Sequence, residues 1–136
     1  MTVELTHEVS SRLRSDHYGW LTTVAKSGRP IPRLVWFYFD GTDLTVYSMP
    51  HAAKISHIKA RPQVSLNLDS DGNGGGIIVV GGTANVDATD VDGREDKPFW
   101  EKYSEDAAKF GMTDALAAYS TRLRISPTQV WTTPTG

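Results

Sequence analysis

The stretch SGRPIPRLVWFYFDGTDLTVYSMPHAAKISHIKARPQVSLNL, residues 27–68, decides the fold because its residue pattern changes three times. Residues 30–40 form a nearly unbroken apolar and aromatic run, which predicts a long strand. Its two prolines stand at the start, where a missing backbone N–H is tolerated. The turn sequence DGTD then predicts a hairpin to the next strand, over residues 44–48.

The second half of this stretch changes from strand to helix and back again. Residues 51–60 combine Ala, Lys and Ile after Pro50, a residue type favoured at helix starts, so we expect a short helix there. Pro62 ends the helix, and the alternation over residues 63–68 predicts the next strand. An antiparallel hairpin joined to further strands by one short helix is typical of a small β-barrel.

The rest of the chain supplies more elements of the same kinds. Apolar residues recur every four positions near the N-terminus and predict a helix over residues 3–15. Residues 90–119 are expected to be mostly helical, with a break at Gly111. Further strands are predicted over 18–25, 76–87 and 121–133. We therefore expect one mainly β domain over residues 1–136, a six-stranded antiparallel barrel with helices outside and a helical insert at about 88–120.

Composition excludes several classes of function. The chain has 136 residues and no cysteine, which removes disulfides, thiolate catalysis and cysteine metal sites. Its four histidines match no zinc spacing, so no metal is expected. The sequence shows no Gly-x-Ser-x-Gly motif, no apolar run of membrane-spanning length and no leader-like segment. We expect a cytoplasmic protein without a membrane partner.

Positive charge gathers in the middle of an acidic chain. The net charge is −2, but residues 17–68 hold six Lys or Arg against two Asp, and residues 47–68 hold no acid at all. A local positive surface of this size suits a small anionic ligand, whereas nucleic acid would require a larger basic field. We expect a small-molecule partner and no nucleic acid.

The junction between the strand at 44–48 and the following helix is the candidate anion site. A helix start exposes unpaired backbone N–H groups and a partial positive charge. Ser48 can add a hydroxyl, and Lys54 lies one turn inside the helix, with His51 and His57 three residues to either side. The alternative is that Ser48 only caps the helix and the basic residues form a solvated face.

These residues resemble the pyridoxamine-phosphate-oxidase-like split β-barrel family, whose fold is also called the FMN-binding split barrel. The likeness lies in a G-x-P segment, an apolar strand with Trp-Phe, a turn with Gly, then S-x-P-x-x-x-K-x-x-x-I and R-P-x-V. It covers about residues 5–87 and the last strand, and is closest to the actinobacterial branch that uses the deazaflavin coenzyme F420.

The resemblance implies a homodimer with a cofactor groove at its interface. It places the cofactor phosphate region against the segment that follows the third strand, here Ser48, Met49, Pro50, Lys54 and Ile55. It places the cofactor ring against the long second strand, here Leu34, Val35 and Trp36. Arg33 is the one basic residue on that strand able to contact the phosphate, where FMN oxidases carry more.

The activity implied is hydride transfer from reduced coenzyme F420 to a small organic substrate such as an enone or a quinone. Two alternatives stay open: an FMN-binding oxidase or reductase of the same fold, and an F420 carrier protein without turnover. No catalytic acid or base stands out in the sequence, and Tyr47, His51 or solvent could supply a proton. Residues 88–120 match the family pattern poorly and are expected to shape the substrate pocket.

Overall fold

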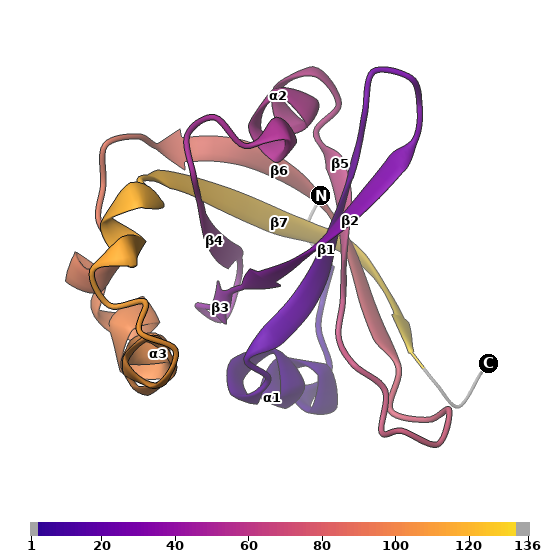
Figure 1. The fold of residues 1–136 in the computed structure, drawn as a ribbon. Coiled ribbons are helices and arrows are strands. Elements are labelled where there is room, and N and C mark those ends of the chain that lie inside the picture. The colour runs from indigo at the N-terminus through magenta and orange to yellow at the C-terminus, as the bar shows by residue number, and fades with distance from the viewer. Residues whose placement is uncertain (1–2, 133–136) are drawn as a thin grey trace.

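The fold is an antiparallel sheet with helices around it, as the computed structural model, which describes residues 3–132, shows (Figure 1). The seven strands form one sheet in the order β2-β1-β5-β6-β7-β4-β3, which is not closed between its two edge strands. The predicted fold class, a mainly β split barrel with flanking helices, is therefore confirmed. The strands are β1 Tyr18–Val24, β2 Pro30–Trp36, β3 Tyr38–Phe39, β4 Leu44–Ser48, β5 Gln63–Asn67, β6 Ile78–Ala88 and β7 Thr121–Thr132.

The predicted count of six strands is wrong, because the run at residues 30–40 divides into β2 and β3 at Phe37. Both backbone groups of Phe37 bind side chains from residues 97–109. Its N–H donates to the Tyr103 hydroxyl at 2.8 Å, and its carbonyl oxygen accepts from Lys102 Nζ, also at 2.8 Å. A residue whose backbone groups bind elsewhere cannot continue the ladder, so the strand breaks there.

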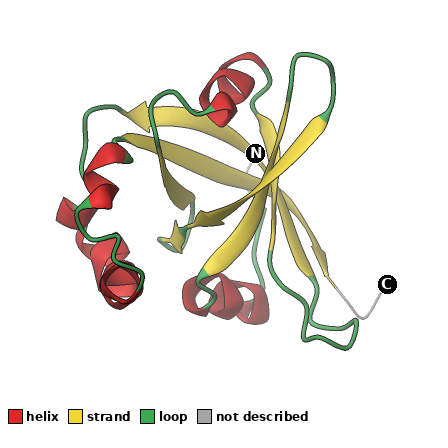
Figure 2. Ribbon diagram, viewed as in Figure 1, coloured by secondary structure: helices red, strands yellow, loops and turns green. Residues whose placement is uncertain are grey.

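The helices cover the ends and one side of the sheet (Figure 2). Helix α1, His7–Ser15, begins after Thr6, whose hydroxyl accepts the Val9 N–H at 3.2 Å and so caps the helix. Helix α2, Ala53–Ala60, lies at the opposite end of the sheet from α1 in Figure 1. Both helices bury apolar side chains in the barrel core, which leaves their polar faces toward solvent.

The segment between β6 and β7 folds as helix α3, Lys97–Lys109, flanked by the 3₁₀ helices η1, Gly93–Glu95, and η2, Ala115–Ala118. Gly111 ends α3 with a positive φ of 67°, which lets the Met112 N–H bond back to the Ala107 oxygen at 2.7 Å. This insert stands beside β3 and β4 in Figure 1 and has its own apolar cluster, separate from the barrel core.

The boundaries of two other predicted elements shift. The helix expected over residues 3–15 begins only at His7, after its capping residue, and the helix expected over residues 51–60 begins at Ala53. Pro50 and His51 form a turn before α2 and are not its first residues. The last strand was predicted to reach residue 133, which lies outside the described residues.

Candidate functional site

An enclosed pocket of about 210 Å³ lies between β2 and the insert. One wall comes from the sheet and α2, through Leu34, Val35, Trp36, Tyr47 and Lys54. The opposite wall comes from the insert, through Phe99, Met112, Leu116 and Tyr119. In this lining Leu34 is 53% exposed and Phe99 is 1% exposed. We call the exposed part of the lining, with Leu34 and Lys54, the mouth, and the fully buried part, with Phe99, the floor.

Four of the nine residues predicted to bind a cofactor line this pocket. Leu34, Val35 and Trp36 are consecutive on β2, and Lys54 lies in the first turn of α2. They come together because β4 returns the chain alongside β2 before the α2 turn begins. The strand-to-helix junction and the apolar strand, separate features in the sequence, thus meet at one place.

Lys54 is the charged residue of this lining. Burial lowers the pKa of its ammonium group, and the nearby Arg33 guanidinium lowers it further. No carboxylate within residues 3–132 forms an ion pair with either side chain. A half-buried cation next to a second cation gains most from an anion, because an anion offsets both the desolvation and the repulsion.

Arg33 is an exposed residue of β2, next to the pocket-lining Leu34 in the sequence. Its Nη1 donates to the Pro32 carbonyl oxygen at 2.8 Å, which leaves the rest of its guanidinium group available to a ligand. The Arg33 guanidinium lowers the pKa of Lys54, as a like charge nearby does. Together they give the mouth a positive field that the floor lacks.

Ser48 does not direct its hydroxyl group at the pocket. The side chain is 1% exposed, and Oγ donates to the Met49 carbonyl oxygen at 3.0 Å. Nor does it cap α2, whose N-cap is Ala52 without a side-chain hydrogen bond. The Ser48 proton thus binds the backbone of the turn, and the residue's contribution here is to fix that turn.

The other predicted residues of this segment occupy different environments. Met49 and Pro50 are exposed in the turn between β4 and α2. Ile55 is buried in the barrel core and anchors α2 there. The turn therefore offers an exposed surface beside Lys54, while Ile55 supports the helix from below.

The shared basic face predicted for α2 does not form. His51 precedes the helix, and His57 Nδ1 lies 2.9 Å from the Thr23 hydroxyl of β1, on the side toward the sheet. Arg61 Nε donates to the Val24 carbonyl oxygen at 2.8 Å and so also binds β1. Of the basic residues from His51 to Arg61, Lys54 alone lines the pocket.

The sequence predicted that residues 88–120 shape a pocket, but it did not identify the residues that form this wall. Of the aromatic residues in the insert, Tyr103 is fully buried, whereas Phe110 is 54% exposed. The helical spacing of Phe99 and Tyr103 was the available signal for a buried face, but it does not show which side chains reach β2.

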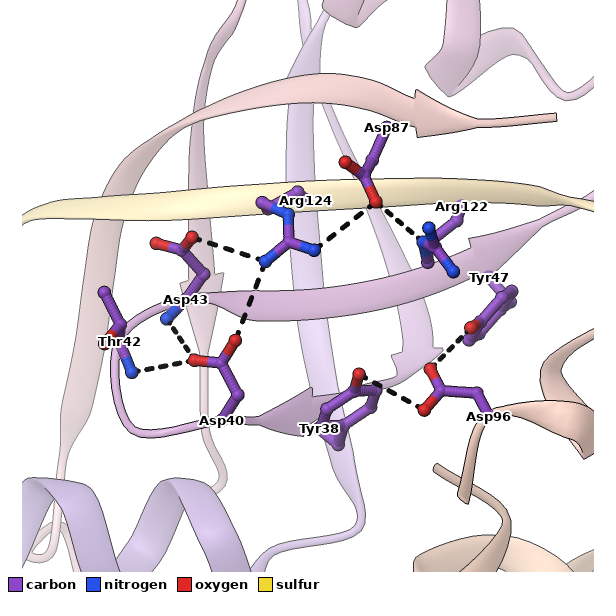
Figure 3. A network of polar contacts seen from close by, with 9 residues as sticks. All are labelled: Tyr38, Asp40, Thr42, Asp43, Tyr47, Asp87, Asp96, Arg122 and Arg124. Carbon is purple, nitrogen blue, oxygen red and sulfur yellow. Dashed lines mark hydrogen bonds and ion pairs between the residues drawn. The ribbon is translucent and has the colours of Figure 1, made fainter. Parts of the chain in front are cut away.

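A second, wide depression of about 820 Å³ is lined by Asp96, the hydrogen-bond partner of the pocket residue Tyr47. Figure 3 shows the Tyr47 hydroxyl directed at Asp96, to which it donates at 2.6 Å, while the Tyr38 hydroxyl donates to the same carboxylate at 3.4 Å. Burial and this carboxylate raise the pKa of Tyr47 well above its usual range. The Tyr47 proton is therefore held by Asp96, which argues against Tyr47 as a ready proton donor.

Figure 3 also shows a second group of contacts, between two arginines of β7 and acidic residues of neighbouring segments. Arg122 Nε donates to Asp87 Oδ2 at 2.7 Å, and Arg124 lies within 3.6 Å of Asp40, Asp43 and Asp87. These pairs satisfy one another, unlike Lys54 and Arg33. The depression is consequently a less suitable anion site than the smaller pocket.

Two negative findings apply to residues 3–132. No three or more His, Asp or Glu side chains lie close enough together to bind a metal ion. No helix is long and apolar enough to cross a lipid bilayer.

Comparison with solved structures shows the same architecture in proteins of different activities. An F420 reductase is 25% identical, with a TM-score of 0.70 over 95% of this chain and 98% of that chain. A FAD-binding protein from Mesorhizobium loti is 27% identical, with a TM-score of 0.65 over 93% of this chain and 92% of that chain. The heme storage protein of Vibrio cholerae is 18% identical, covers 96% of this chain and 95% of that chain at a TM-score of 0.64, and is alike in fold alone.

A search of curated proteins found no match. The family model described as pyridoxamine 5'-phosphate oxidase matches residues 5–134, which is nearly the whole chain. The match covers the strand of the pocket, the α2 junction and the insert. On this evidence the chain belongs to the pyridoxamine 5'-phosphate oxidase family.

Proposed function

We propose that this protein binds a flavin-type cofactor, reduced coenzyme F420 in particular, and transfers hydride from it to a small organic acceptor. The observation that carries the proposal is Lys54: a half-buried ammonium group without a carboxylate partner in the described chain, at the mouth of an apolar pocket. Such an arrangement costs free energy unless an anion binds there.

The residues present fit a cofactor of this kind. Lys54 and Arg33 would hold its anionic tail, and the exposed Met49–Pro50 turn lies beside them. The β2 segment from Leu34 to Trp36 would lie along its ring system, since these residues line the pocket. When bound, the cofactor supplies the hydride, and the protein supplies binding, orientation and exclusion of water.

F420 is preferred to FMN because the FMN oxidases of the resembled family carry more basic residues on the second strand than the single Arg33 present here. Lys54 and Arg33 are the two cations at the mouth, and Arg61 binds the β1 backbone. The F420 reductase and the FAD-binding protein resemble this chain about equally well, so a flavin-dependent enzyme is the second candidate. In the resembled family, that candidate is an FMN-dependent oxidase or reductase. Protein from a host without F420 separates the two: a yellow preparation with a flavin spectrum supports FMN, and a colourless one that takes up F420 supports the first proposal.

The exposed face of the sheet supports a homodimer. The strand register aligns Leu34, Trp20, Asn67, Val79 and Trp131 in one row across five strands. Trp20 is 45% exposed and Trp131 51% exposed, and large aromatic side chains aligned in this way are typical of interfaces. Because Leu34 belongs both to this row and to the pocket mouth, a second copy on this face would border the cofactor groove.

The dimer proposal predicts that Trp20→Lys weakens association. Sedimentation velocity would show wild-type protein as a dimer and the variant shifted toward monomer, because the new ammonium group would have to be desolvated at the interface. Lys26→Ala, in the turn after β1, is the matched control. A wild-type monomer at high concentration would contradict the proposal.

Titration of deazaflavin fluorescence tests the cofactor proposal. Lys54→Ala is expected to weaken F420 binding by about 1.5–3 kcal/mol, the contribution of a hydrogen bond to a charged group. Lys59→Ala, an exposed lysine on the same helix, controls for the loss of one positive charge. Equal affinity in all three proteins would remove Lys54 from the site. An acceptor panel with reduced cofactor then separates an enzyme from a carrier without turnover.

A further inference from the structure

The loop between β5 and β6 contains Asn73, one of the three asparagines of the chain, followed directly by Gly74. Both residues are exposed, and the loop projects beyond the ends of the two strands (Figure 1). Gly74 has a positive φ of 85°, and a Cβ placed on it would meet no other atom within 4 Å. Its backbone nitrogen is therefore open to close approach by another group.

The Gly74 N–H also lacks a hydrogen-bond partner among residues 3–132. The N–H groups on either side of it, those of Asn73 and Gly75, both donate to Asp71 Oδ1, at 2.8 and 3.0 Å. The Asp71 N–H in turn donates to the Gly75 carbonyl oxygen at 2.9 Å. The Gly74 nitrogen thus lies inside an ordered turn without the intramolecular bond that engages most backbone amides.

The two ends of the loop are held by helix α1. Arg12 donates to the Asp69 carbonyl oxygen through Nη2 and to the Gly76 carbonyl oxygen through Nη1, both at 2.9 Å. These bonds fix the positions where the loop leaves and rejoins the sheet. Asn73 and Gly74 lie at its exposed centre, where a local change of the chain need not disturb the strands.

An asparagine followed by glycine has a reaction available with its own backbone. The Gly74 nitrogen attacks Asn73 Cγ, the N–Cγ bond forms, the Cγ–Nδ2 bond breaks, and the Gly74 amide proton leaves with the Nδ2 amino group as ammonia. The product is a cyclic imide. Water then opens the ring at Cγ, which yields aspartate, or at the main-chain carbon of Asn73, which yields isoaspartate. Water is the one co-reactant, and nothing is oxidised or reduced.

The other two asparagines, Asn67 and Asn85, lie in strands β5 and β6. Asn67 is followed by Leu68, whose N–H donates to the Ile78 carbonyl oxygen at 3.0 Å. Asn85 is followed by Val86, whose branched side chain crowds its own backbone nitrogen. Ring closure is therefore opposed at both positions by the strand conformation and by the residue that follows.

We infer that Asn73 is a site of spontaneous modification in the folded protein, where the cyclic imide with Gly74 converts it to aspartate and isoaspartate. The aspartate product adds a negative charge beside Asp71. The isoaspartate product also directs the main chain through Asn73 Cβ and Cγ, which lengthens the connection between β5 and β6. The protein thus changes its charge and this connection with age, whether or not a cofactor binds elsewhere.

Peptide mapping of the full chain tests this modification. The protein is incubated at mildly alkaline pH, either folded in buffer or unfolded in urea, and then digested. Trypsin releases residues 60–94 as one peptide (the Arg-Pro bond inside it is not cleaved), and this peptide contains all three asparagines. Replacement of an NH₂ group by OH changes its mass, and fragmentation assigns the change. Asn73 should lose its amide in the folded protein about as fast as in urea, while Asn67 and Asn85 keep theirs.

Anion exchange of the intact protein gives a second readout. The folded wild type should develop a more acidic form during incubation, and a fresh Asn73→Asp variant marks where the aspartate product elutes. Asn73→Gln is the matched control, because its longer side chain keeps the amide but closes a larger and less favoured ring. This variant should stay in the original peak.

Retention of the Asn73 amide in the folded protein overturns the inference. If the chain in urea loses that amide under the same conditions, the fold protects Asn73, contrary to the exposure and free N–H on which the inference depends. Loss of the amides of Asn67 and Asn85 at the same rate as that of Asn73 in the folded protein would overturn it as well, because the loop would then confer no selectivity.

Discussion

Replacing Lys102 with methionine should change how the stability of the protein depends on pH. Lys102 Nζ donates to the Phe37 carbonyl oxygen at 2.8 Å and lies 4.2 Å from the centroid of the Phe37 ring. Burial lowers the pKa of this ammonium group from 10.5 to about 8, and the Asp16 carboxylate offsets part of that effect. Folding therefore makes Lys102 release its proton more readily.

The sign and the size of the effect follow from this difference. Below about pH 8 the ammonium group is charged in both the folded and the unfolded protein, so the free-energy cost of burying it does not change with pH. Between about pH 8 and 10.5 the unfolded chain holds the proton more tightly, so the free energy of unfolding rises with pH. A difference of about 2.5 pH units corresponds to at most about 3.4 kcal/mol. Solvent screening of this partly exposed side chain reduces the expected gain to about 1–2 kcal/mol.

Urea unfolding followed by tryptophan fluorescence measures this gain. We expect the stability of the wild type relative to Lys102→Met to rise by about 1–2 kcal/mol between about pH 7 and about pH 10. The tyrosines whose pKa burial raises, Tyr38, Tyr47 and Tyr103, are present in both proteins, so their contributions largely cancel. Lys109→Met, on the exposed end of the same helix, controls for a lost surface charge. Parallel stability curves for wild type and Lys102→Met would refute the reasoning.

Other substitutions test the packing of the fold by the same unfolding assay. Tyr103→Phe leaves the Phe37 N–H without its 2.8 Å acceptor and should cost about 1–3 kcal/mol; an unchanged midpoint would mean that water replaces the hydroxyl. Gly82→Ala would place a Cβ 2.7 Å from the Ser126 carbonyl oxygen, so the β6–β7 pairing must shift and stability should fall by about 1–3 kcal/mol. Thr6→Ala removes the cap of α1 and should cost about 1 kcal/mol, with Thr6→Ser as the conservative control.

The sheet could largely be predicted because its information is local. Alternation and turn residues locate the strands, and the run over residues 30–40 is correctly placed in the sheet. The break at Phe37 is not local, since it comes from Tyr103 and Lys102, some 65 residues away. An apolar run contains no sign that distant side chains will take its backbone groups.

The individual residues of the candidate site were predictable on one wall only. The spacing in residues 47–60 and the family resemblance pointed to Lys54, which does line the pocket. Ser48 matched the same pattern, yet its hydroxyl binds a backbone oxygen in the turn. The insert was expected to shape the pocket, but its lining residues escaped prediction because Met112 and Tyr119 follow a helix end, where no periodicity shows which way side chains face.

A crystal structure of the protein with F420 tests the central claim most directly. The account predicts that the anionic tail of the cofactor lies within hydrogen-bond distance of Lys54 Nζ, with the cofactor ring along β2 at Leu34. A cofactor bound in the wide depression around Asp96, or a Lys54 side chain directed into solvent in the complex, would contradict it.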